Sequence, residues 1–277
     1  MLRIAAIEFL NAAPLMAGLD RDPRFALQYT LPSACADALR DGDAELGVIP
    51  VIELARIPGL VPLGGIGVAS GAGSGAAAEV RSILLIARRP LAQVRTLALD
   101  PASRTSAALA QILLRRRFGA EFSLVAPRSG WRQSLADADA ALSIGDPALR
   151  LRISGEIEAA GLEAHDLARV WHDWTGTPFV FALWGIRRTS WEANRAWLPQ
   201  RLRQALDDGW AARDQLIAAW ASRLALPEVE VRHYLERNVT YRLAPAHEEG
   251  MRRFFALAAV EGLVPKHAPA WLEALPA

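Results

Sequence analysis

The most informative stretch for the fold is Ile7-Glu8-Phe9-Leu10-Asn11-Ala12-Ala13-Pro14-Leu15. It follows a short apolar segment, residues 2–7, that is predicted to be a buried strand, and its proline sets up a turn or a helix start. Open α/β sheets place ligand-binding groups at the carboxyl ends of their strands, so Asn11 is a candidate ligand contact. Asn is also among the best helix-capping residues, and a capping role stays equally open at this point.

Outward from this stretch, predicted strands and helices alternate. A strand at 25–31, a helix at 32–40 and a strand at 43–50 follow the first strand. This alternation predicts a doubly wound α/β sheet. A second set of strands and helices lies between about 90 and 180, and the pattern beyond Arg187 is helical.

Two strongly apolar segments, 82–87 and 179–186, border the second set. If both are crossing strands, the chain forms two lobes with a ligand cleft between them, as in hinge-closing solute-binding folds. Lobe I would then comprise residues 1–87 plus 187–277, including the C-terminal helices, and lobe II residues 88–186. A single six-stranded sheet is the alternative.

A second polar turn, Asp100-Pro101-Ala102-Ser103-Arg104-Thr105-Ser106, stands between a strand at 95–99 and a helix at 107–118. Free N–H groups at a helix start attract anions, and three hydroxyls with an arginine exceed what capping needs. The turn is therefore a candidate anion site. A further strand end, Ile144-Gly145-Asp146, offers Asp146 as a helix cap, a ligand contact or a base.

Two other segments are expected to be irregular. Residues 64–78 are dense in Gly, Ala and Ser and predict a flexible loop, and they lack the Gly-Lys-Ser/Thr pattern of a phosphate loop. Residues 166–178 are irregular and aromatic. His172 beside Asp173 suggests a general base, but adjacent side chains diverge on strands and helices, so a structural aromatic cluster is favoured.

The composition excludes several classes of protein. The 277 residues carry a formal net charge of +1, which offers no surplus of positive charge for binding nucleic acid. The single cysteine, Cys35, rules out an intrachain disulfide and a multi-cysteine metal site. No run of about 20 apolar residues predicts a membrane span, and no signal peptide is recognised, so a cytoplasmic location is expected.

Several motifs then come in an order that matches a known family. They are Glu8-Phe9-Leu10-Asn11 with Pro14-Leu15, Leu46-Gly-Val-Ile-Pro-Val-Ile-Glu53, Val80-Arg-Ser-Ile-Leu-Leu85, Leu97 to Ser106, Ile144-Gly-Asp-Pro-Ala148 and the tryptophan-rich Trp171 to Trp184. Together they closely resemble the menaquinone-biosynthesis family of the futalosine pathway, and within it the chorismate dehydratases. The motifs cover about residues 1–190, and the Gly/Ser-rich loop before Arg81 departs from the family pattern.

The resemblance implies a periplasmic-binding-protein type II fold used by a cytoplasmic enzyme. Chorismate dehydratases of this family convert chorismate to 3-[(1-carboxyvinyl)oxy]benzoate and water without a metal or an organic cofactor. The expected partner is therefore a small molecule, chorismate, with no role for nucleic acid or a membrane.

The candidate site residues follow from the motifs and from the two carboxylates of chorismate. Ser103, Arg104, Thr105 and Ser106, with the helix start, are expected to bind one carboxylate, and Ser82 to be a further donor. Asn11 is expected to hydrogen-bond the leaving hydroxyl or the enolpyruvyl group from the opposite lobe.

Asp146 is a candidate base or orienting group beside these donors. The side-chain carboxylate of the substrate itself is the alternative proton acceptor, which would explain why the motifs contain no obvious His–Asp pair.

Two other functions compete with this prediction. The sister enzyme of the pathway makes 1,4-dihydroxy-6-naphthoate, and its chemistry calls for a base with a pKa near neutrality, usually histidine. The histidines are His165, His172, His233, His247 and His267, all outside the strand-end motifs. A non-catalytic binding protein for an anionic solute is the other alternative, which the missing export signal disfavours.

Overall fold

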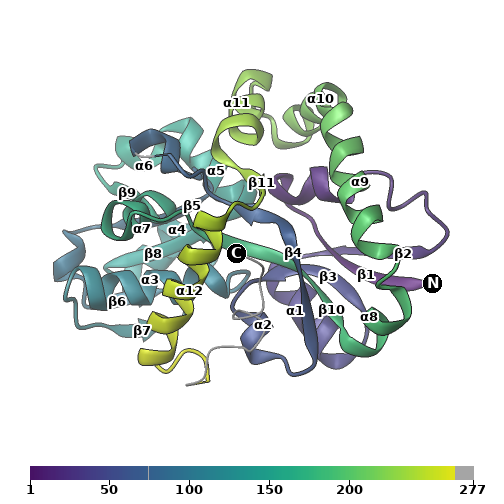
Figure 1. Cartoon of the computed structure of the whole chain (residues 1–277). Helices are drawn as coiled ribbons and strands as arrows, with labels where there is room; N and C mark the ends of the chain where they lie inside the picture. The colour runs from purple at the N-terminus through teal and green to yellow at the C-terminus, as the bar shows by residue number, and fades with distance from the viewer. Residues whose placement is uncertain (74, 266–277) are drawn as a thin grey trace.

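The computed structural model describes residues 1–73 and 75–265, and its strands form two separate sheets (Figure 1). The six-stranded sheet runs β11-β4-β10-β3-β1-β2, with β1 (Leu2–Ile7), β2 (Phe25–Thr30), β3 (Leu46–Pro50), β4 (Leu60–Ala69), β10 (Val180–Arg187) and β11 (Thr240–Arg242). The five-stranded sheet runs β7-β6-β8-β5-β9, with β5 (Ile83–Ala87), β6 (Thr96–Ala98), β7 (Ser123–Val125), β8 (Ala140–Ile144) and β9 (Glu163–Asp166). We call the parts built on these sheets lobe I and lobe II.

Helices cover both sheets. The α-helices are α1 (Pro32–Asp41), α2 (Glu53–Arg56), α3 (Thr105–Ile112), α4 (Gly130–Asp137), α5 (Gly145–Ser154), α6 (Glu156–Ala159), α7 (Leu167–Thr175), α8 (Arg188–Asn194), α9 (Leu198–Ala211), α10 (Arg213–Leu224), α11 (Glu228–His233) and α12 (Pro245–Val260). The shorter or wider turns are the 3-10 helices η1 (Leu10–Met16), η2 (Gly75–Ala78) and η3 (Leu91–Gln93) and the π-helices η4 (Leu113–Arg117) and η5 (Tyr234–Asn238). Among the described residues, no helix is both long and apolar enough to cross a bilayer.

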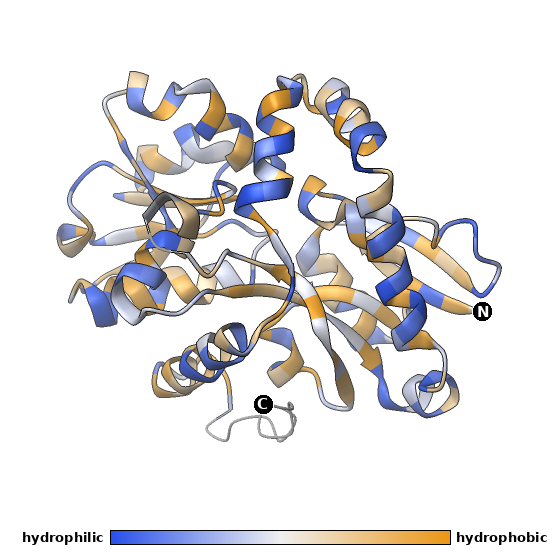
Figure 2. Ribbon diagram, turned by 45° about the horizontal axis from the view of Figure 1, so that its top comes forward, coloured by the Kyte–Doolittle hydropathy of each residue, from blue (hydrophilic) through white to orange (hydrophobic). Residues whose placement is uncertain are grey.

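Each sheet mixes parallel and antiparallel neighbours. In lobe I, β1 pairs in parallel with β2 and β3, and β10 lies antiparallel between β3 and β4. In lobe II, β6 is parallel to β7 and β8, and β5 lies antiparallel between β8 and β9. The central strands are apolar along most of their length (Figure 2), as expected of strands covered on both faces. The two-lobed α/β prediction is confirmed, and the single-sheet alternative is wrong.

The expected lobe boundaries, at 87 and 187, are each displaced by one strand. β5 belongs to the sheet of lobe II, although residues 1–87 were expected in lobe I. β10 belongs to the sheet of lobe I, although residues 88–186 were expected in lobe II. Both strands are buried along nearly their whole length, so their apolar pattern does not distinguish which sheet receives them.

The C-terminal helices do not all return to lobe I. Helices α8 and α9 pack on lobe I. Helix α12, in contrast, contacts β10 of lobe I and α3 of lobe II (Figure 1). Glu261, just after α12, pairs with Arg115 at 3.1 Å and also with Arg116. The last described helix therefore connects the two lobes.

The prediction of a flexible loop over residues 64–78 is partly wrong, because strand β4 continues to Ala69. Gly67 allows this continuation: a Cβ there would lie 2.5 Å from the carbonyl oxygen of Ala182 in β10. The two backbones thus approach more closely than any other residue would permit.

The prediction of irregular structure over residues 166–178 is also wrong, because they contain helix α7. Asp166 caps this helix by accepting hydrogen bonds from the N–H groups of Ala168 (3.0 Å) and Arg169 (3.2 Å). The aromatic cluster itself is present, since the ring of buried Trp171 packs edge-on against Phe179 with 5.3 Å between centroids.

Candidate functional site

A small cavity lies between the lobes, at the carboxyl ends of β1, β6 and β8. Its volume is about 50 Å³, and its polar lining consists of Asn11, Ser103, Arg104, Thr105 and Ser106. The remaining walls are largely apolar and include Phe9, Ile83, Gly145 and Phe181. The structure therefore brings Asn11 and the 103–106 turn, which lie more than 90 residues apart in sequence, into one cavity, which we call the cleft.

Asn11 reaches the cleft from lobe I. It lies inside η1, whose N-cap is Phe9, so the capping alternative for Asn11 is wrong. The side-chain oxygen Oδ1 of Asn11 is buried and has no hydrogen-bond partner within the described residues. A buried amide oxygen without a partner costs free energy unless a ligand or water supplies a donor.

The 103–106 turn reaches the cleft from lobe II. Asp100 shapes it by accepting hydrogen bonds from the N–H groups of Ala102 (2.9 Å) and Ile144 (3.1 Å). Helix α3 then starts at Thr105, and no side chain caps its first N–H groups. With the nearly buried hydroxyls of Ser103, Thr105 and Ser106, this helix start is suited to an anion.

Arg104 differs from the other residues of the turn, because its guanidinium is already paired. Nη2 of Arg104 donates to both carboxylate oxygens of Asp37, at 2.9 and 2.8 Å, and Nη1 lies 3.6 Å from Glu53. Glu53 is fully buried and also pairs with Arg40 (2.6 Å) and Arg56 (2.9 Å). The charge of Arg104 therefore joins lobe II to carboxylates of lobe I.

Asp146 also connects the lobes. Its Oδ1 accepts a hydrogen bond of 3.0 Å from the N–H of Leu10, the first residue of η1. Asp146 makes no capping hydrogen bond in α5, so it caps a helix of the opposite lobe instead of its own. Burial raises the pKa of this carboxyl to about 6, against the lowering effects of the Leu10 N–H and of Arg223.

Gly145 lets the two lobes meet beside Asp146. It has a φ of +67°, and a Cβ there would lie 2.4 Å from the ring of Phe9 in lobe I. Only glycine satisfies both the left-handed backbone and this close approach.

Ser82 is fully buried next to the cleft, but it does not line it. Its hydroxyl accepts a hydrogen bond of 2.8 Å from the hydroxyl of Tyr234 in η5. Burial raises the pKa of Tyr234 out of its ordinary range, while the neighbouring Ser82 hydroxyl and the Asn11 amide lower it. Tyr234 thus lies beside two predicted site residues, although no local sequence pattern marks it.

The lobes are in contact around the cleft. The N–H of Ser33 donates to the carbonyl of Ala102 (3.2 Å), and the N–H of Ile52 donates to Oγ1 of Thr105 (3.4 Å). Pockets that hold small organic ligands usually measure about 300–1,000 Å³. A cleft of about 50 Å³ must open before such a ligand can enter.

The chain is similar to proteins of known name over most of its length. Its residues 2–260 match the model of a protein family described as menaquinone biosynthesis. It is 30% identical over 193 residues to a chorismate dehydratase of Thermus thermophilus, an alignment that covers 64% of this chain and 67% of that protein.

Solved structures show the fold. Protein AF1704 of Archaeoglobus fulgidus superposes with a TM-score of 0.74 at 16% identity, covering 95% of this chain and 98% of that one. The periplasmic aliphatic sulphonate binding protein of Escherichia coli superposes with a TM-score of 0.63 at 18% identity, covering 95% and 88%. The fold is thus that of periplasmic binding proteins, as predicted, and the match over residues 2–260 shows that the chain belongs to the menaquinone biosynthesis family.

Proposed function

We propose that this protein is a chorismate dehydratase, a hydro-lyase that eliminates water from chorismate to give 3-[(1-carboxyvinyl)oxy]benzoate. The observation that carries the proposal is the cleft itself. It is lined by Asn11, whose Oδ1 is buried without a partner among the described residues, and by a helix start with three hydroxyls and no side-chain cap. The identity to the Thermus thermophilus chorismate dehydratase gives the substrate.

The reaction removes the proton on the ring carbon that bears the ether and expels the hydroxyl from the neighbouring ring carbon. The ring becomes aromatic, which supplies the driving force, so the protein mainly positions the substrate and stabilises developing charge. The ring carboxylate accepts negative charge through the diene as the proton leaves. Donors around that carboxylate therefore stabilise the transition state more than the ground state.

The site residues divide between these tasks. The hydroxyls of Ser103, Thr105 and Ser106 and the N–H groups of α3 bind a carboxylate of the substrate. Arg104 holds this turn in place by its ion pair with Asp37. Ser82 does not contact the substrate directly and instead positions Tyr234 by accepting its hydrogen bond. The unpartnered Oδ1 of Asn11 accepts a hydrogen bond from the substrate hydroxyl and so orients it. The group that takes the ring proton passes it to this hydroxyl, which leaves as water.

Two groups can accept the ring proton. Asp146 stands at the edge of the cleft with a pKa of about 6, which suits a base near neutral pH. The enolpyruvyl carboxylate of the substrate is the other acceptor. The two acceptors are distinguished by the pH dependence of kcat/KM in the wild type and in Asp146→Asn.

The sister reaction, which makes 1,4-dihydroxy-6-naphthoate, fits this cleft less well. Among the residues that the structure describes, no histidine lines the cleft. The ring of buried His247 is 3.0 Å from the carbonyl of Ser70 and accepts from the N–H of Ala244, so it has a structural role. His267 lies outside the described residues.

Incubation of the purified protein with chorismate tests the proposal. We expect chorismate to disappear and the aromatic product to form, followed by ultraviolet absorbance and mass spectrometry. Tight binding of chorismate without turnover would overturn the proposal and favour a solute-binding protein.

A further inference from the structure

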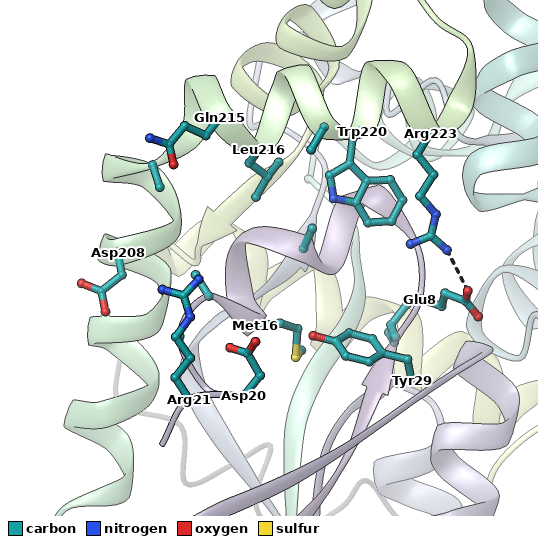
Figure 3. A pocket seen from close by; sticks show the side chains of 16 residues that line it. Glu8, Met16, Asp20, Arg21, Tyr29, Asp208, Gln215, Leu216, Trp220 and Arg223 are labelled. Carbon is teal, nitrogen blue, oxygen red and sulfur yellow. Dashed lines mark hydrogen bonds and ion pairs between the residues drawn. The ribbon is translucent and has the colours of Figure 1, made fainter. Parts of the chain in front are cut away.

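A larger hollow lies in lobe I (Figure 3). It measures about 830 Å³ and lies between η1, the end of β2 and the helices α9 and α10. We call it the groove. Ile7, the last residue of β1, lines both the groove and the cleft. The volume of the groove, unlike that of the cleft, lies within the range of pockets that hold small molecules.

The groove is apolar in its middle and charged at its ends. Met16, Tyr29 and Trp220 form the middle (Figure 3). At the end next to β1, Arg223 of α10 donates a hydrogen bond of 2.7 Å to the carboxylate of Glu8. The charged residues at the other end are Asp20, Arg21 and Asp208 (Figure 3). The apolar middle and the end with Arg223 match a flat, unsaturated ring that carries a carboxylate.

Arg223 is better placed than Arg104 of the cleft to receive a substrate carboxylate. The guanidinium of Arg104 in the cleft is held by Asp37 and lies close to the buried Glu53. The side chain of Arg223, in contrast, is 53% exposed and pairs with Glu8, itself 48% exposed. An exposed ion pair contributes little to stability, so an incoming carboxylate can replace Glu8 at small cost.

Two contacts tie Arg223 to the groove and to the cleft. Its guanidinium lies 4.6 Å from the centre of the Trp220 ring, which fixes its direction along the wall of the groove. Arg223 and Glu8 also act electrostatically on Asp146 of lobe II, with opposite signs. The ion pair therefore stands at the junction between the open groove and the closed cleft.

We propose that the groove is the entry site for the substrate, and that Arg223 captures one of its carboxylates by displacing Glu8 before the lobes close around the ring. The inference rests on the proposed function and names a binding residue for it. Arg223 acts on capture, whereas the residues of the cleft act on the elimination.

Steady-state kinetics with chorismate test this role in four variants. Arg223→Gln is expected to raise KM about tenfold with little change in kcat, since it removes a charge-assisted hydrogen bond made on capture. Arg223→Lys should recover part of the loss. Glu8→Gln should lower KM, because it frees Arg223 from its competitor. Arg203→Gln, which removes an exposed cation of α9 outside the groove, is the matched control.

The salt dependence gives a second readout. Added salt should raise the KM of the wild type and of Arg203→Gln but have little effect on Arg223→Gln. Equal KM values for Arg223→Gln and Arg203→Gln, or a raised KM for Glu8→Gln, would overturn the capture role.

Calorimetric titration with chorismate keeps this inference distinct from the proposed function. If the wild type binds chorismate without turnover, the proposed function fails, and the dissociation constants of the same variants still decide the role of Arg223. If the wild type does not bind chorismate at all, both proposals are overturned.

Discussion

The cleft and the groove share Ile7, but they differ in size, burial and charge. The cleft measures about 50 Å³ and presents an amide and three hydroxyls that are largely buried. The groove measures about 830 Å³ and has exposed charged side chains at its ends. Hydrogen bonds are strongest where water is absent, whereas exposed charges act over distance and are screened by salt.

Under the two proposals, this difference corresponds to two different steps. The groove suits the capture of an anion from solution, and the cleft suits the stabilisation of charge during the elimination. Substitutions in the cleft should therefore lower kcat, and substitutions in the groove should change KM. Substitutions at Asn11, Gly145, Asp146 and Tyr234 test that division.

Asn11→Ala should have the largest effect. We expect kcat to fall at least 100-fold, a loss typical of removing one polar group that contacts the reacting atoms. Far-ultraviolet circular dichroism should be unchanged, because Oδ1 of Asn11 has no partner within the described protein. Asn194→Ala, in α8 on the surface of lobe I, is the control, and it loses only a bond to the carbonyl of Ser190. Near-wild-type turnover by Asn11→Ala would exclude Asn11 from the site.

Gly145→Ala should disturb the closed cleft. Its new methyl group would lie 2.4 Å from the ring of Phe9, so either this ring moves into the cleft or the lobes separate at this point. We expect kcat/KM to fall about tenfold and the free energy of unfolding to fall by about 1–3 kcal/mol, measured by urea denaturation.

Gly155→Ala is the matched control for Gly145→Ala. Gly155 ends the same helix with a φ of +68°, and nothing lies within 4 Å of its added Cβ. The difference between the two variants thus isolates the contact with Phe9 from backbone strain. Equal activity losses in both would show that closure at Gly145 does not matter for turnover.

Asp146→Asn should change the pH dependence of kcat/KM. If Asp146 is the base, the wild-type rate falls about tenfold per pH unit below about 6, the pKa of this carboxyl, and the variant is slow and lacks that inflection. An unchanged profile would assign the proton to the carboxylate of the substrate.

The free energy of unfolding of Asp146→Asn, compared with that of the wild type at several pH values, tests whether the pKa of Asp146 is raised. Folding raises the pKa of Asp146 from 3.8 to about 6, so its contribution to stability is full below pH 3.8 and is lost as the pH rises through about 6. The advantage of wild type over Asp146→Asn in the free energy of unfolding should therefore decrease between pH 4 and pH 7. An increase over that range would contradict the raised pKa.

The sequence predicts those parts of the site that have local signals. Asn11 follows an apolar strand, and the turn at 103–106 combines hydroxyls with a helix start, so the sequence alone makes both candidates. The structure places both in the cleft. Tyr234 and Arg223 belong to helical segments whose patterns resemble ordinary helix faces. Only the packing of the C-terminal helices against the lobes brings Tyr234 next to Ser82 and Arg223 into the groove.

The fold was predictable to a similar degree. Alternation of strands and helices predicted an α/β fold, because such alternation has few packed solutions. The apolar segments 82–87 and 179–186 pointed to two lobes but left a single sheet open. The assignment of β5 and β10 to their sheets was not predictable, since a continuous apolar run is compatible with either sheet. The role of Arg104 was also ambiguous, because its carboxylate partner Asp37 lies 67 residues away in the other lobe.

Tyr234→Phe should have the smallest effect and limits the extent of the catalytic site. The variant loses one hydrogen bond, from the Tyr234 hydroxyl to Ser82, which costs about 1 kcal/mol of unfolding free energy. We expect kcat to fall severalfold, because Ser82 and Asn11 lose the hydroxyl that contacts both of them. KM should be unchanged, because neither residue moves out of its position. Tyr241→Phe, at another buried tyrosine of the C-terminal segment, is the control. If Tyr234→Phe instead lost as much kcat as Asn11→Ala, the phenol itself would contact the substrate, and the cleft would extend to η5.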